Sequence, residues 1–167
     1  ILFILIISLI FPLTLNGPLM NWEQLPDQSK YLKDTITIRD FEFGLLDGRK
    51  AIFFSSFIFA ITPFPYIESF NDIGLINRLF FSLIIIFLIH KKVKNMLIFY
   101  LILSPPLILY SSTALKEILV IIFTILAFFA IVERKNLIFI ITMSALFFLK
   151  VQNAILILPF FLLYKYS

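Results

Sequence analysis

The organisation of this chain depends on residues 104–117, which read SPPLILYSSTALKE. This stretch lies between two long apolar runs, and its Lys116-Glu117 pair directly precedes the uncharged run 118–132. An unpaired charge at the centre of a bilayer costs at least about 2.5–3.5 kcal/mol. The pair is therefore expected at a membrane surface, or paired inside the protein.

The composition predicts a membrane protein. Hydrophobic residues make up 61% of the 167 residues, 22 residues are Phe and none is Cys, whereas a soluble domain is about half apolar. We predict an all-α fold, a polytopic transmembrane helix bundle with one long, partly helical polar loop. The chain begins without Met inside an apolar run and ends just after another, which predicts a fragment of a longer protein.

The apolar runs divide the chain into segments. We predict a single transmembrane domain over 1–167, with a clipped span at 1–14, an outer loop at 15–75 that contains an interfacial or re-entrant segment at 51–67, and further transmembrane helices at 76–167. Pro63 and Pro65 break the helix of segment 51–67 after about twelve residues, whereas a span needs about 20. If this segment crosses instead, the long loop lies on the cytoplasmic side.

Two clusters of bases set the expected orientation. The loops at 90–94 and 133–135 carry these bases and lie two predicted spans apart. Clustered Lys and Arg favour the cytoplasmic side of a membrane. Both loops are therefore expected at one side, and residues 111–117 at the other.

The long loop has a nearly balanced charge. Six acids and five bases lie between residues 15 and 50, which indicates a mixed surface and argues against a nucleic-acid partner. Asp27 follows Pro26 and is a favoured N-cap residue, so a helix is expected from there. Its apolar side chains would face lipid headgroups. The alternation at 35–39 also permits a short strand.

The strongest candidate site is the Lys116-Glu117 pair. Adjacent residues point about 100° apart on a helix, so the two side chains cannot pair with each other. Lys116 would bind the phosphate of a lipid-linked substrate, and Glu117 would orient or deprotonate a hydroxyl. The alternative is structural, with Glu117 favourable to the helix dipole and Lys116 extended to the headgroups.

Other polar residues form weaker candidates. One apolar region is interrupted by Lys150, Gln152 and Asn153. These residues form either a binding site or a short outer turn between two helices. Asp27 and Tyr31 lie one helical turn apart, although a capping Asp is common.

The remaining polar positions suggest structural roles. Asn77-Arg78 is expected only to anchor the start of its span, and His90 to lie at the interface. The sequence has no metal-ligand spacing and no Gly-rich phosphate loop, and it contains 4 Gly.

These motifs resemble a family. The early loop with Asp27 to Tyr31, together with the pattern from Pro105 through residues 110–112 to Lys116-Glu117, is similar to bacterial surface-polysaccharide polymerases of the O-antigen and capsule type. Those proteins resemble multi-spanning glycosyltransferases that use polyprenyl-phosphate sugars. Lys150 lies where such polymerases often carry an Arg, and the following Pro is absent. The resemblance covers about 25–153.

The resemblance implies an enzyme that joins lipid-linked sugar units at the outer leaflet of the bacterial inner membrane, as a multi-pass integral protein. Asp27 and Glu117 would be the catalytic acids, and Lys116, Lys150, Tyr31 and Gln152 would contact the substrate. The partners would be a polyprenyl-linked glycan and membrane lipids. No cofactor is implied, except a divalent metal at Asp27 if single sugars are transferred.

Two other classes of function compete. A transporter or flippase also uses Pro-broken helices, and it is expected to contain an internal repeat. The sequence has no second copy of the 104–117 pattern. A non-catalytic membrane scaffold predicts that Lys116, Glu117 and Lys150 tolerate replacement.

Overall fold

The computed structural model describes residues 27–46 and 48–166. The predicted clipped span at 1–14 lies outside these residues, and the division into loop and spans stays a prediction. In the described part every regular element is helical. The elements are α2 (Asp27–Arg39), η2 (Phe43–Leu45), α3 (Lys50–Ile61), α4 (Phe70–His90), α5 (Asn95–Leu103), α6 (Pro105–Tyr110), α7 (Glu117–Val132), α8 (Asn136–Leu149) and α9 (Val151–Tyr166).

The prediction of a polytopic transmembrane bundle is corrected by the lengths of these helices. In the described residues only α4, with 21 residues, is long and apolar enough to cross a membrane. Helices α7, α8 and α9 have 16, 14 and 16 residues. At 1.5 Å per residue, 16 residues extend about 24 Å, less than the roughly 30 Å of a hydrocarbon core. The all-helical part of the prediction holds, and α4 supports association with a membrane, whereas a multi-pass location is not supported.

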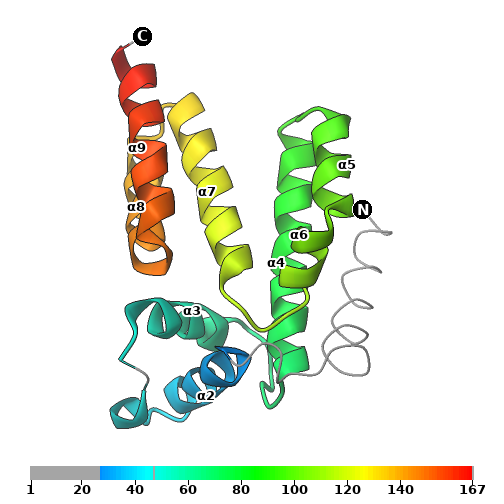
Figure 1. The fold of residues 1–167 in the computed structure, drawn as a ribbon, viewed down its shortest axis with the longest axis vertical. Helices are drawn as coiled ribbons and strands as arrows, with labels where there is room; N and C mark the ends of the chain where they lie inside the picture. The colour runs from blue at the N-terminus through cyan, green and yellow to red at the C-terminus, as the bar shows by residue number, and fades with distance from the viewer. Residues whose placement is uncertain (1–26, 47, 167) are drawn as a thin grey trace.

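The helices form two groups (Figure 1). Helices α7, α8 and α9 lie together and α4 runs alongside α7, whereas α2 and α3 lie below α7, α8 and α9 and beside the lower part of α4. Helices α4 and α7 contribute to both hydrophobic clusters of the core, one shared with α2, α3, α8 and α9 and the other with α5. Aromatic pairs link neighbouring elements. The rings of Phe54 and Phe148 stack between α3 and α8, with centroids 5.6 Å apart.

Residues 35–39 belong to α2, so the alternative of a short strand is wrong. The buried side chains of Tyr31, Thr35 and Ile38 follow helical spacing and face the core. The Thr35 hydroxyl donates a hydrogen bond to the Tyr31 carbonyl at 2.6 Å, which is compatible only with a helical turn. Tertiary burial of this face therefore decides between helix and strand.

Helix α3 ends at Ile61, shortly before Pro63 and Pro65, as their ring geometry predicts. The Arg39 guanidinium at the end of α2 donates hydrogen bonds to the carbonyls of Ala60, Thr62 and Phe64 at 3.2, 3.1 and 2.8 Å. The last carbonyls of a helix have no partner inside the helix. Arg39 thus completes the hydrogen bonding at the end of α3 and joins it to α2.

The two basic loops lie at the same end of the molecule. Lys91, after α4, and Lys135, before α8, both form ion pairs with Glu133. Residues 111–117 lie at the opposite end of α7, where they contact α4 at Asn77 and Arg78 and α2 at Gln28 (Figure 1). The sequence prediction that the loops at 90–94 and 133–135 share one end is therefore confirmed.

Candidate functional site

The connection between α6 and α7 is a buried, non-helical segment. Ser111, Ser112, Thr113 and Ala114 are all 0% exposed. The segment begins where α6 ends at Tyr110, and α6 itself starts with Pro at its first positions, where a missing N–H does no harm. Buried backbone groups outside a helix must find other hydrogen-bond partners. Side chains from α4 and α2 supply them.

Helix α4 binds this segment through two polar residues. The Asn77 amide donates to the carbonyls of Thr113 and Leu115, both at 2.7 Å. The Arg78 guanidinium donates to the Ser111 hydroxyl at 2.6 Å and lies 5.0 Å from the centroid of the Phe81 ring. Asn77 is 0% exposed and Arg78 is 2% exposed.

From the sequence, Asn77 and Arg78 are expected only to anchor the start of a span. The structure gives them a different role, because both are buried against residues 111–115. The signal was present in the sequence. An ionisable residue within an apolar span is a functional hypothesis by default, and Arg78 meets that description.

Helix α2 binds the same segment from another side. The Gln28 side-chain oxygen accepts a hydrogen bond from the Ala114 N–H at 2.8 Å, and Gln28 is 2% exposed. This contact joins residues 86 positions apart in the chain. It places the first turn of α2, which carries Asp27, beside the residues that lead into α7.

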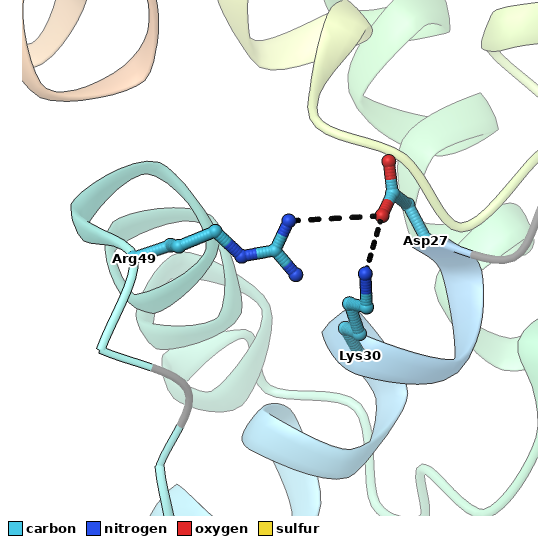
Figure 2. Close-up of polar contacts among 3 residues, drawn as sticks. All are labelled: Asp27, Lys30 and Arg49. Atoms are coloured by element: carbon cyan, nitrogen blue, oxygen red, sulfur yellow. Dashed lines mark hydrogen bonds and ion pairs between the residues drawn. The ribbon is translucent and has the colours of Figure 1, made fainter.

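Asp27 lies in a small exposed charge cluster (Figure 2). Its carboxylate is 3.0 Å from the Lys30 ammonium and 3.9 Å from the Arg49 guanidinium. Exposed pairs of this kind contribute about 0–1 kcal/mol to stability. The cluster therefore matters less for folding than for what it presents at the surface, a carboxylate flanked by two cations.

Lys116 and Glu117 lie at the start of α7. Lys116 is the N-cap residue and Glu117 the first helical residue, where a carboxylate is favourable to the helix dipole. One carboxylate oxygen of Glu117 is buried and has no hydrogen-bond partner among the described residues. Buried polar atoms are usually satisfied by protein or water. An unpartnered buried carboxylate oxygen is thus an unusual feature of this helix start.

The other predicted site residues lie elsewhere. Tyr31 is 4% exposed and packs in the core, so the structure does not place its ring at a surface where substrate would contact it. Lys150 and Gln152 are exposed at the turn between α8 and α9. Within the described residues, neither has a hydrogen bond or ion pair with Asp27, Lys116 or Glu117.

A metal ion finds little support here. Among residues 27–46 and 48–166, no three His, Asp or Glu side chains gather in a way that would hold a metal. Asp27, the residue expected to bind one in a single-sugar transferase, already faces Lys30 and Arg49. A third cation would be repelled by these two.

No protein-family model matches the chain, and no curated protein or solved structure matches it.

Proposed function

We propose that the chain is a membrane-associated transferase that joins sugar units carried on a polyprenyl diphosphate, as enzymes of bacterial surface-polysaccharide synthesis do. The observation that carries the proposal is the hydrogen bond between Gln28 and Ala114. It brings the early acid Asp27 to the same region as Lys116 and Glu117, although these residues lie far apart in the chain. One composite site is thereby supported.

The reaction assigns a role to each charged group. The bond between the anomeric carbon and the diphosphate breaks, a bond to the acceptor hydroxyl oxygen forms, and the hydroxyl proton passes to a carboxylate. Glu117 is the base, because it is a partly exposed carboxylate that directly follows Lys116 at the start of α7. Asp27 orients the acceptor. A positioned base contributes about 10²–10⁴-fold to the rate.

The departing polyprenyl diphosphate carries negative charge. Lys116 at the start of α7 would stabilise that charge, and the exposed cations Lys30 and Arg49 would bind the same group. Fixed cations that face a developing negative charge lower the reaction barrier. The residues for phosphate and for proton transfer are thus present at one end of the molecule.

The test uses the full-length protein reconstituted in lipid nanodiscs with a polyprenyl-diphosphate-linked oligosaccharide as donor. We expect Glu117→Gln to reduce the rate of glycan extension by about 10²–10⁴-fold, and Lys116→Gln and Asp27→Asn to reduce it as well. Glu42→Gln and Asp40→Asn are the matched controls, because these acids are exposed beyond the far end of α2.

Two outcomes would contradict the proposal. One is the absence of any glycan transfer by the folded wild-type protein. The other is full activity in folded Glu117→Gln, Lys116→Gln and Asp27→Asn variants, which would favour a scaffold without an active site.

A further inference from the structure

The end of the molecule opposite the candidate site carries an excess of exposed positive charge. Glu133 is occupied by ion pairs with Lys91 and Lys135. Lys92, Lys94 and Arg134 are exposed, and none of them has an ion pair within the described residues. Three cations at this end are thus available to an external anion.

Two of these cations occupy backbone positions that usually suit glycine. Lys92 and Arg134 have φ angles of 56° and 55°, directly after the ends of α4 and α7. The turns close with hydrogen bonds from the Val93 N–H to the Leu88 carbonyl at 3.1 Å, and from the Lys135 N–H to the Ala130 carbonyl at 2.8 Å. Glycine is the common residue at such helix ends because it lacks a Cβ. A strained residue is a reason to look for function.

Arg134 also lines a pocket of about 220 Å³ between α7, the start of α8 and α9. Arg134, Asn136 and Tyr164 supply its polar side, and Ala130, Ile131 and Phe161 supply its apolar side. The Tyr164 hydroxyl donates to the Val132 carbonyl at 3.3 Å, which positions the ring at the rim. A polar group and an attached apolar chain can therefore be bound side by side.

We propose that this end of the molecule binds an anionic phospholipid. Arg134 contacts the phosphodiester in the pocket, the apolar side receives the glycerol end of the acyl chains, and Lys92 and Lys94 face neighbouring headgroups. Arg suits this role because its planar guanidinium can bind two phosphate oxygens at once. The charge of the surface selects an anionic lipid over a zwitterionic one. The proposal does not depend on the transferase function.

The test measures lipid binding to the purified full-length protein in detergent by native mass spectrometry. Phosphatidylglycerol and phosphatidylcholine with the same acyl chains are titrated separately. A single basic residue near an anionic surface changes binding by about fivefold. We expect the wild type to prefer phosphatidylglycerol, Arg134→Gln to lose about fivefold of that preference, and Lys33→Gln on α2 to keep it.

A second variant guards against loss of folding. Arg134→Gly fits the left-handed backbone at φ 55° and should fold at least as well as the wild type, yet lose the preference as Arg134→Gln does. Equal binding of the two lipids by the wild type, or unchanged preference in Arg134→Gly, would overturn the proposal. Displacement of phosphatidylglycerol by equimolar inorganic phosphate would also overturn it, because the site would then take free phosphate.

Discussion

Asn77 and Arg78 explain why polar side chains are retained in the middle of an apolar helix. The buried segment 111–115 lies outside any helix, and Asn77 binds two of its carbonyls while Arg78 binds the Ser111 hydroxyl. Leaving a buried polar group without its partner costs about 1–3 kcal/mol. At this scale the two residues act as supports for the start of α7, and through it for Lys116 and Glu117.

Glu133 makes a prediction about pH dependence. Hydrogen bonds from Lys135 and Lys91 lower the pKa of Glu133 from 4.5 to about 2. A carboxylate whose pKa is lower in the folded state stabilises that state above its unfolded pKa, and the effect is lost as pH falls towards the folded value. We therefore expect Glu133→Gln to be less stable than the wild type at neutral pH, with the difference shrinking from about pH 4.5 to 2.

The measurement is thermal unfolding of both proteins across that pH range. Glu68→Gln, an exposed acid with no ion pair among the described residues, serves as the control. A difference between Glu133→Gln and the wild type that stays constant from neutral pH to pH 2 would contradict this account of Glu133.

At the scale of elements, α2 matters most for the candidate site. It packs along α3, and Arg39 at its end donates to the carbonyl of Ala60 at the end of α3. At its other end, Gln28 contacts the segment that leads into α7. The first contact makes the two short helices one layer, and the second places that layer beside Lys116. The contacts of Arg39 and Gln28, at the two ends of α2, together fix the position of Asp27.

Replacement of Gln28 by Leu tests this connection. The change leaves the buried Ala114 N–H without its acceptor, at a cost of about 1–3 kcal/mol. We expect the Ala114 amide to exchange hydrogen about tenfold faster or more, as measured by hydrogen exchange with mass spectrometry. Peptides from α8 should be unaffected. Unchanged exchange at residues 111–117 would show that α2 does not hold this segment.

At the scale of the whole molecule, polar chemistry is divided between two ends. The starts of α2 and α7 lie at one end of the molecule, and the turns after α4 and α7, with their bases, lie at the other (Figure 1). If α4 spans a membrane, as its length and composition allow, the two ends meet opposite faces of the bilayer. This arrangement suits a protein that binds a lipid-linked substrate at one face and anionic headgroups at the other.

The absence of Cys makes this division measurable. Single cysteines at positions 27, 92, 116 and 150 of the full-length protein would be labelled on intact cells with a membrane-impermeant maleimide, before and after permeabilisation. We expect positions 27 and 116 to react alike and position 92 to react in the opposite condition. If position 27 is labelled under the same condition as position 92, and position 116 under the other condition, residues 27 and 116 do not share one polar end.

Local chemistry allowed much of the helical structure to be predicted. Pro63 and Pro65 predicted the end of α3, the base clusters predicted the turns after α4 and α7, and Asp27 predicted the start of α2. These signals act within one turn of the chain, because proline geometry and helix capping depend on neighbouring residues. The number of spans was overestimated because α7, α8 and α9 have 16, 14 and 16 residues, whereas a span needs about 20.

The sequence by itself determined that the chain is helical, where its helices break and which charged residues its ends carry. The tertiary structure alone decided that Tyr31 is buried, that Asn77 and Arg78 hold the segment before α7, and that Gln28 joins α2 to Ala114. The physical reason is distance along the chain. Helix propensity and proline breaks act between near neighbours, whereas these contacts satisfy buried polar groups across 33 to 86 residues and exist only once the helices have packed.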